Sequence, residues 1–323
     1  MIVYENGYII PPFNLACEEY LLNSDCVEDI FMLWRNAPSV IIGRNQNAYA
    51  ELNLDFIEKN DIAVVRRLTG GGAVFHDLGN VNFTFITSKK DDAVLNFEMF
   101  TRPIIDVLRK LGADAELSGR NDIVIDGHKI SGNAQCSYNG KIMHHGTLLF
   151  DADISNLVDS LNVDKAKIES KGIKSIRSRV ANIKDFIGGD MDVIDFKEYI
   201  ENSIDAEHRI LSAEDAEKIQ KLADEKYSAW EWTFGQSKQY QYTNKKRYPY
   251  GTVEVNLNVD AGYITDIRIN GDYFGLGDIG ELEKRLVGSR YESTEILNKL
   301  KDSENYIAGA TAKDLLDIIL NIM

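Results

Sequence analysis

Residues 123–149 read IVIDGHKISGNAQCSYNGKIMHHGTLL and contain two turn signals between segments rich in apolar residues. The pairs Asp126-Gly127 and Asn139-Gly140 separate these segments. Asp-Gly and Asn-Gly are preferred in two-residue hairpin turns, because both central residues of such turns need positive φ. The stretch therefore predicts consecutive hairpins and a mainly antiparallel sheet.

Helical spacing of apolar residues predicts helices beside this sheet at Asn14–Asn23, Leu54–Asn60 and Phe97–Leu111, the last ended by Gly112. Short apolar runs predict further strands at Ile30–Trp34, Val40–Gly43, Ile62–Leu68, Ala73–His76 and Val81–Thr87. An antiparallel sheet with flanking helices is an α+β domain.

The last part of the chain has its own pattern. Residues 253–259 alternate between apolar and polar, a turn follows at 260–262, and Ile264–Ile269 returns. Helices are predicted at Ile279–Leu286, Ser293–Leu300 and Ala312–Ile322. We therefore expect two domains, a large one over residues 1–240 and a small α+β domain over residues 241–323.

Composition limits the class of function. The 323 residues are 44% hydrophobic, which is enough for a large buried core. The net charge of -15 disfavours a general nucleic-acid binder. There is no signal-like N-terminus and no apolar run long enough to span a bilayer, and the three cysteines form no CxxC pair. We expect a cytoplasmic monomer that binds no membrane.

The strongest local motif is RRLTGGGAVFHD at residues 66–77. Consecutive glycines let backbone N–H groups approach an anion, and the two preceding arginines supply donors suited to phosphate. The alternative is a glycine-rich turn with arginines at a strand end. The pattern alone does not decide between an anion site and a simple turn.

A second motif runs from Gly119 to Asp122 and continues after the turn with Lys129-Ile130-Ser131-Gly132. Asp122 offers a hard oxygen ligand for Mg²⁺, and Lys129 offers a point charge for a carboxylate or phosphate. The alternative for Lys129 is an exposed hairpin lysine without a ligand.

Two further features carry charge. His144 and His145 are neighbours in a predicted strand, so their side chains should point to opposite faces and cannot easily chelate one metal. The basic run Lys165–Lys184 contrasts with the acidic chain. It is either a solvated surface segment or a loop that closes over a polyanion.

Two common nucleotide motifs do not apply. The GxGxxG match at residues 275–280 lacks the parallel strand that a dinucleotide fold requires, so we interpret it as accidental. No GxxxxGK[ST] sequence occurs, which excludes an ordinary P-loop. An ATP site in this chain would need another design.

Together the motifs resemble those of the lipoate–protein ligases. The matching segments, in chain order, are residues 67–80, 119–122, 129–132, 144–149 and 171–180, with flanking matches at 14–16 and 34–36. The resemblance implies a catalytic domain like that of biotin ligases and a small accessory domain. It also implies formation of lipoyl-AMP from lipoate and Mg-ATP, followed by lipoyl transfer to a lysine of an apo lipoyl domain. The acceptors would be acyltransferase subunits of 2-oxoacid dehydrogenases and the glycine-cleavage H protein.

The resemblance also implies residue roles. For ATP it points to Arg67, Gly72, Ala73, Val74, Phe75, Asn121, Asp122 and Lys129, with Asp122 near Mg²⁺ and Lys129 also catalytic. For lipoate it points to Leu15, Cys17, Arg67, Gly71, Lys129 and His145. A loop covering the adenylate would contain Lys171, Gly172, Arg177 and Arg179.

Three alternatives stay open at this point. A biotin ligase is disfavoured because its glycine loop has a different sequence. An octanoyl or lipoyl transferase would use a cysteine thioester, for which Cys136 is the candidate. A non-catalytic regulator would bind lipoate or nucleotide without releasing pyrophosphate.

Overall fold

The computed structural model describes residues 1–88, 94–161, 179–235 and 240–320. The chain divides into two compact units. The first contains Met1–Ile41, Tyr49–Arg66 and Ala73–Thr233, and the second contains Ile42–Ala48, Arg67–Gly72 and Phe234–Met323. Part of the glycine-rich loop therefore groups with the C-terminal segment rather than with the sequence on either side of it.

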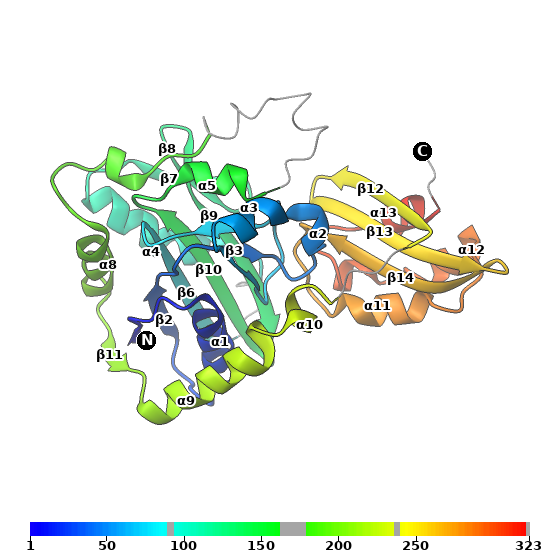
Figure 1. Cartoon of the computed structure of the whole chain (residues 1–323), viewed down its shortest axis with the longest axis horizontal. Coiled ribbons are helices and arrows are strands. Elements are labelled where there is room, and N and C mark those ends of the chain that lie inside the picture. The colour runs from blue at the N-terminus through cyan, green and yellow to red at the C-terminus, as the bar shows by residue number, and fades with distance from the viewer. Residues whose placement is uncertain (89–93, 162–178, 236–239, 321–323) are drawn as a thin grey trace. The chain divides into compact units, whose positions relative to one another are not determined.

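The first unit contains an eight-stranded sheet in the order β11-β1-β2-β6-β10-β9-β8-β7 (Figure 1). The strands are β1 (Ile2–Glu5), β2 (Ile30–Trp34), β6 (Asn80–Ser88), β7 (Ala115–Ser118), β8 (Asp122–Ile125), β9 (His128–Tyr138), β10 (Lys141–Leu149) and β11 (Glu207–Ile210). Strand β1 pairs in parallel with β2 and β11, and the remaining neighbours are antiparallel.

The two predicted hairpins are confirmed. Asp126 and Gly127 have φ of 50° and 76°, and Asn139 and Gly140 have φ of 48° and 74°. Both turns thus have two left-handed central residues, as the Asp-Gly and Asn-Gly pairs require. They join β8 to β9 and β9 to β10, which form the centre of the α+β unit.

A smaller sheet, in the order β4-β3-β5, consists of β3 (Ser39–Ile42), β4 (Ala63–Arg66) and β5 (Val74–His76). The helices of the first unit are α1 (Pro11–Leu22), α2 (Ala48–Glu51), α3 (Leu54–Lys59), α4 (Phe97–Lys110), α5 (Ile154–Asp159), α8 (Val193–Asn202), α9 (Ala213–Leu222) and α10 (Trp230–Thr233). Two short helical segments complete this unit: η2 (Ile183–Asp185), before α8, and η3 (Ala223–Tyr227), between α9 and α10. Helix α1 starts three residues before the predicted helix, because Pro11 and Pro12 are well suited to a first helical turn.

Both faces of the large sheet are covered, and alternate residues of each strand separate them. Phe31 and Phe83 belong to a core shared with Ile104 of α4 and Phe196 of α8. The residues next to them along the strands point to the opposite face, toward α1. Met32, which follows Phe31, is an example, because its sulfur lies 3.7 Å from that of Cys17. The sheet is thus a buried middle layer, which explains why its strands lack a clean polar face.

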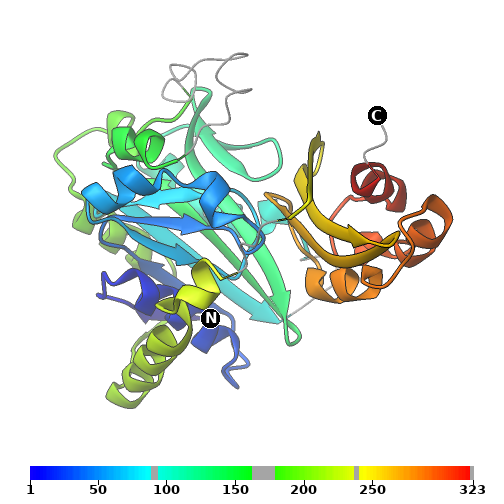
Figure 2. The ribbon, with the colours of Figure 1, turned by 45° about the vertical axis from the view of Figure 1, so that its right-hand side comes forward.

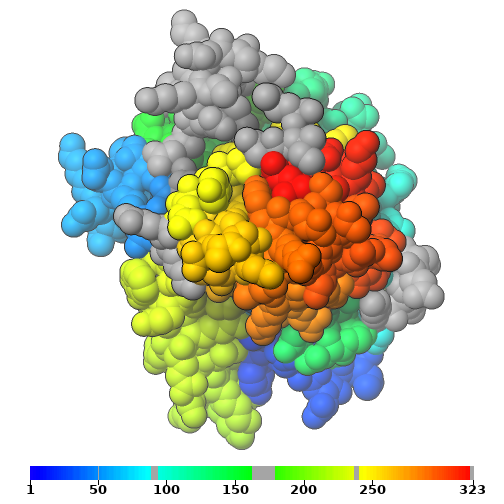
Figure 3. Space-filling view, turned by 90° about the vertical axis from the view of Figure 1, so that its right-hand side faces the viewer, coloured from blue at the N-terminus to red at the C-terminus, as the bar shows by residue number. Residues whose placement is uncertain are grey.

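The second unit has a three-stranded antiparallel sheet, β12 (Tyr242–Tyr248), β13 (Gly251–Asp260) and β14 (Tyr263–Gly271). It packs with α11 (Ile279–Leu286), α12 (Ser293–Lys299), η4 (Ser303–Asn305) and α13 (Ala312–Ile319) (Figure 2). Figure 3 shows these strands in yellow and the helices in orange to red on one face. Because β13 and β14 are antiparallel, the GxGxxG match at 275–280 does not sit in a parallel βαβ unit.

None of the helices in the described ranges has the length and apolar content that a bilayer-spanning helix needs.

Candidate active site

The turn between β8 and β9 brings a lysine and a carboxylate together. Lys129 Nζ lies 2.8 Å from Asp122 Oδ1, and the two side chains remain 39% and 37% exposed. An ion pair this open to solvent contributes little to stability, on the order of 0–1 kcal/mol. It does hold a cation and a carboxylate of the second sequence motif at an accessible position.

A β-bulge sets the direction of Lys129. Ile123 pairs with Ser131, but Val124 pairs with Lys129, so Ile130 is the extra residue and is fully buried. A bulge changes the direction of the side chains around it. Here it places Lys129 beside Gly132, where an added Cβ would lie 3.1 Å from Nζ. Glycine at position 132 therefore leaves room for the amine.

The last described residues of the basic run lie along Lys129. The Lys129 N–H donates to the carbonyl of Arg179 (2.6 Å), and the Ala181 N–H donates to the carbonyl of Lys129 (3.1 Å). Val180 forms a parallel bridge with Lys129. The exposed Arg179 thus joins the site through its backbone. Lys171, Gly172 and Arg177 lie outside the described residues.

Asn121 is fixed by Asn133 on β9. The Asn133 backbone N–H and its side-chain Nδ2 donate to the Asn121 carbonyl at 2.9 and 3.0 Å. In return Asn121 Nδ2 donates to the Asn133 carbonyl at 2.7 Å. The residue before Asp122 is therefore held by three hydrogen bonds, which orders the predicted Asn121-Asp122 pair.

The two histidines point to opposite faces, as predicted. His145 Nδ1 lies 2.8 Å from Glu18 Oε1 on α1. The same Glu18 oxygen accepts from Thr84 Oγ1 (2.7 Å), and Thr84 Oγ1 accepts from Trp34 Nε1 (2.9 Å). His144 lies on the other face of the sheet, against α4. Sequence reasoning did not identify Glu18 as a candidate site residue. Its position among the apolar, core-facing residues of α1 could have indicated a buried carboxylate with a polar partner.

Leu15 and Cys17 are fully buried on α1. Burial raises the pKa of the Cys17 thiol far above its usual range, so at neutral pH it is a protonated, weakly reactive group. This environment fits the interpretation of Cys17 as an apolar lining residue and not as a nucleophile.

The glycine-rich loop belongs to the second unit up to Gly72. Arg67 is 5% exposed, and its Nη2 donates to the carbonyls of Gly70 (2.7 Å) and Gly72 (2.8 Å). Its Nε donates to Thr69 Oγ1 at 2.9 Å. The guanidinium thus shapes the loop from inside. Gly71 has φ of 95°, a conformation that favours glycine.

Contacts within the second unit hold this loop on its C-terminal segment. The Gly71 N–H donates to the carbonyl of Tyr273 (3.4 Å), and an added Cβ on Gly70 would collide with that same carbonyl. Gly72 is exposed and open, with nothing near an added Cβ. Gly72 is thus the exposed residue of the glycine-rich loop.

The other loop residues lie in the first unit. Ala73 and Val74 are half-buried and Phe75 is buried, with Val74 and Phe75 paired to β3. Arg66 is also in the first unit, and its role is structural. Its Nε and Nη2 donate to the carbonyls of Trp232 (3.0 Å) and Thr233 (2.6 Å). For Arg66 these contacts favour the alternative of an arginine at a strand end over one that serves a phosphate.

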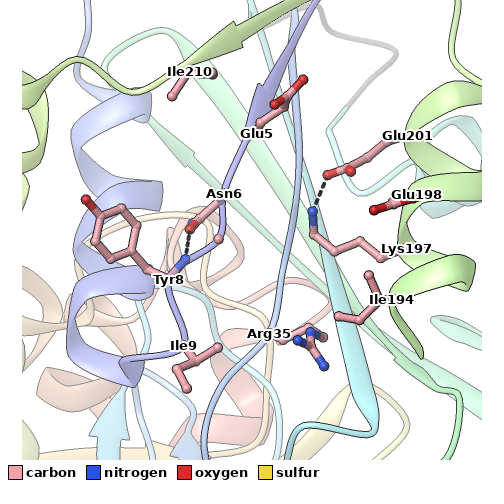
Figure 4. A pocket seen from close by; sticks show the side chains of 11 residues that line it. Glu5, Asn6, Tyr8, Ile9, Arg35, Ile194, Lys197, Glu198, Glu201 and Ile210 are labelled. Atoms are coloured by element: carbon pink, nitrogen blue, oxygen red, sulfur yellow. Dashed lines mark hydrogen bonds and ion pairs between the residues drawn. The ribbon is translucent and has the colours of Figure 1, made fainter. Parts of the chain in front are cut away.

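A pocket of about 460 Å³ lies elsewhere on the first unit, between the segment after β1 and helix α8 (Figure 4). Lys197 turns toward Glu201 there, with Nζ 2.6 Å from Oε1. Among the described residues, none of those predicted to bind ATP or lipoate lines this pocket. It is mixed in charge, with Arg35 and Glu198 on its wall, and has no assigned ligand.

Among the described residues, no group of three or more His, Cys, Asp or Glu side chains is placed to hold a metal ion. Asp122 therefore offers a single carboxylate, already next to a lysine. Mg²⁺ commonly binds through one or two carboxylates together with substrate phosphates. This donor set suits a magnesium ion that arrives with a nucleotide.

Comparison with known proteins covers almost the whole chain. Residues 10–205 match the family model of the lipoyl protein ligase A/B catalytic domain, and residues 237–319 match that of the bacterial lipoate protein ligase C-terminus. Lipoate-protein ligase LplJ of Bacillus subtilis (strain 168) is 46% identical over 330 residues, covering 99% of this chain and 100% of the relative.

Two solved structures are similar. The P. falciparum protein LipL1, in complex with lipoate, aligns with a TM-score of 0.79 and 28% identity over 99% of this chain and 98% of its own. A lipoate-protein ligase A bound with ATP aligns with a TM-score of 0.61 and 30% identity over 73% of this chain and 98% of its own.

Proposed function

The chain belongs to the lipoate–protein ligase family, and from this premise we propose that Lys129 and Asp122 form the site where it activates lipoate. The enzyme uses ATP to convert lipoate to lipoyl-AMP and then transfers the lipoyl group to a lysine of an apo lipoyl domain. The observation that carries the proposal is the exposed Lys129–Asp122 pair beside Arg179 and Val180.

In the first step a carboxylate oxygen of lipoate attacks the α-phosphorus of ATP. The bond between the α-phosphorus and the bridging oxygen breaks, and pyrophosphate leaves. Lys129 contacts the lipoate carboxylate and the α-phosphate, where its positive charge stabilises the developing negative charge. The Lys129 side chain is 39% exposed, so substrate oxygens can replace Asp122 as the partner of its amine.

Asp122 would hold Mg²⁺ together with the phosphates of ATP, and the bound ion would withdraw electron density from those phosphates. The Asn133 contacts place Asn121 so that it can position the nucleotide. Arg67 would act on ATP mainly by holding the loop that exposes the backbone of Gly72, with Ala73, Val74 and Phe75 following it.

The lipoyl chain would lie near Leu15, Cys17 and His145. Gly71 stays a predicted lipoate contact. Leu15 and Cys17 are buried apolar side chains on α1, and the Glu18 contact fixes the orientation of His145. The basic run, including Lys171, Gly172, Arg177 and Arg179, would cover the adenylate and limit its hydrolysis. Its described end already lies against Lys129.

In the second step the amine of the acceptor lysine attacks the lipoyl carbonyl. The C–O bond to AMP breaks, an amide forms, and the amine loses a proton. We propose the 2-oxoacid dehydrogenase acyltransferase subunits and the glycine-cleavage H protein as acceptors. We further propose a catalytic domain to about residue 240, an accessory domain beyond it, and action as a cytoplasmic monomer.

The test uses the purified protein with lipoate, Mg-ATP and an apo lipoyl domain, and follows the intact mass of the acceptor. Addition of one lipoyl group that needs both ATP and Mg²⁺ supports the proposal. Replacement of lipoate by biotin should leave the acceptor mass unchanged. An unmodified acceptor despite lipoate-dependent adenylate formation would contradict the assigned acceptor class, and ligand binding without pyrophosphate release would favour a regulator.

The cysteine thioester alternative has its own test. Cys136 is half-buried on β9, opposite Met143 in the ladder. The variant Cys136→Ser should keep most of the ATP-dependent ligation, because no step of the proposed reaction passes through a thiol. Complete loss of ligation in a folded Cys136→Ser protein would support the transferase instead.

A further inference from the structure

Asn133 on β9 contacts the segment that carries Asp122 and also a residue of β10. Its backbone and side chain fix Asn121, the residue directly before Asp122. Its side-chain Nδ2 also lies 3.2 Å from Ser131 Oγ. Because Nδ2 already donates to the Asn121 carbonyl and to Ser131 Oγ, the hydrogen bond to the amide oxygen of Asn133 comes from another residue.

That donor is His144 on β10. His144 is completely buried, and its Nε2 lies 3.3 Å from Asn133 Oδ1. Because Oδ1 only accepts hydrogen bonds, the ring must carry its proton on Nε2. Burial, and then the nearby charge of His145, hold the pKa of His144 well below its usual range. The ring is therefore neutral, with one donor and one acceptor nitrogen.

The surroundings of His144 are otherwise aromatic. Its ring stacks on Phe100 at 4.8 Å and meets Phe97 edge-on at 5.5 Å. Among the described residues, Nδ1 is buried without a hydrogen-bond partner, which is unfavourable. A phenylalanine would fill this place without that penalty, so packing alone does not account for a histidine.

A glycine in the pairing of β9 with β10 leaves space for the hydrogen bond between Asn133 and His144. Gly146 pairs with Asn133 across β9 and β10. An added Cβ on Gly146 would collide with Asn133 Oδ1 and would lie 2.6 Å from the ring of Phe83. The absence of a side chain at position 146 thus gives the Asn133 amide the space in which it can meet His144.

We propose that His144 is a positioning residue for adenylation, which fixes the Asn133 amide and, through it, holds Asn121 and Asp122 opposite Lys129. His144 touches no substrate in this account. The inference rests on the proposed function, because it assigns the nucleotide and its magnesium ion to Asn121 and Asp122.

The test compares His144→Phe with wild type in two assays: lipoate-dependent exchange of pyrophosphate into ATP, and lipoyl transfer from supplied lipoyl-AMP. The substitution keeps an aromatic ring and leaves Asn133 Oδ1 without its donor. We expect adenylation to fall about 10-fold, since a buried acceptor without a donor is unfavourable and can reorient. Transfer from lipoyl-AMP should change less than about twofold. His144→Gln, which restores an N–H donor, should recover part of the adenylation rate.

A second variant approaches the bond from the other side. Asn133→Ala should slow adenylation by at least as much, and the double variant should be no slower than Asn133→Ala alone, since both changes act through one amide. The matched packing control is Phe100→Leu, which disturbs the same aromatic cluster but keeps the His144–Asn133 bond. It should lower the unfolding temperature without a selective loss of adenylation.

Unchanged adenylation in His144→Phe would overturn the inference, as would equal losses in adenylation and transfer in both His144→Phe and Phe100→Leu. If His144→Phe does not fold, the other two variants decide. A selective loss of adenylation in Asn133→Ala, with activity partly kept in His144→Gln, supports the inference, and unchanged adenylation in Asn133→Ala overturns it. Failure of the proposed function looks different: wild type would show no lipoate-dependent exchange, or Lys129→Ala would exchange at the wild-type rate.

Discussion

Replacement of Arg66 by methionine should destabilise the first unit strongly and leave nucleotide binding by the folded enzyme unchanged. Arg66 is 1% exposed and donates to the carbonyls of Trp232 and Thr233 at 3.0 and 2.6 Å. A hydrogen bond from a charged donor contributes about 1.5–3 kcal/mol. The loss of two such bonds should therefore cost about 3–6 kcal/mol, a large part of the 5–15 kcal/mol typical of whole proteins.

The assay is urea unfolding followed by tryptophan fluorescence. It reports on the first unit, because Trp34, Trp230 and Trp232 all lie there. Arg66→Lys, which can restore one of the two bonds, should lose about half as much stability as Arg66→Met. If Arg66→Met unfolds at the wild-type urea concentration but shows a raised KM for ATP, Arg66 serves the phosphate and the structural assignment is incorrect.

Three further predictions follow from buried groups. Because burial raises the pKa of Cys17, native protein at pH 8 should react with iodoacetamide much faster at Cys26 than at Cys17, by peptide mapping; equal labelling would contradict this. Below about pH 6.5 the unfolded chain protonates His144 but the folded chain does not. In that range the free energy of unfolding should therefore decrease by up to about 1.4 kcal/mol for each unit by which the pH is lowered. His144→Phe should remove that part of the slope in urea titrations at several pH values, and an unchanged slope would refute it. Gly146→Ala should lower the free energy of unfolding by about 1–3 kcal/mol, since its Cβ would overlap Asn133; a neutral result would show that the ladder can relax.

Local patterns predicted the centre of the fold because local chemistry determines it. The Asp126-Gly127 and Asn139-Gly140 turns adopt the left-handed conformations that these pairs favour. Strands β1 and β11 were not predicted, since each has only four residues and is defined by parallel pairing with distant segments. Strand β12 was missed because its residues are mostly exposed and polar, with only Tyr248 buried.

The candidate site shows the same division. Lys129 and Asp122 were predicted from sequence, and one hairpin brings them together. Arg66 and Arg67 are adjacent and chemically identical, so sequence could not tell that one caps α10 and the other supports the glycine loop. Asn133 was also missed, because its role depends on a bulged register and a glycine on the neighbouring strand.

The most direct test of the account is lipoate-dependent pyrophosphate release by Lys129→Ala beside wild type. The exposed pair with Asp122 contributes on the order of 0–1 kcal/mol, so the variant should fold normally. Lys218→Ala, which removes another exposed lysine paired with an acid, is the matched control and should keep wild-type activity. We predict that Lys129→Ala loses at least about 100-fold in rate, as expected when one charge-stabilising group is removed from a transition state. Near-normal pyrophosphate release by folded Lys129→Ala would contradict the assignment of this site.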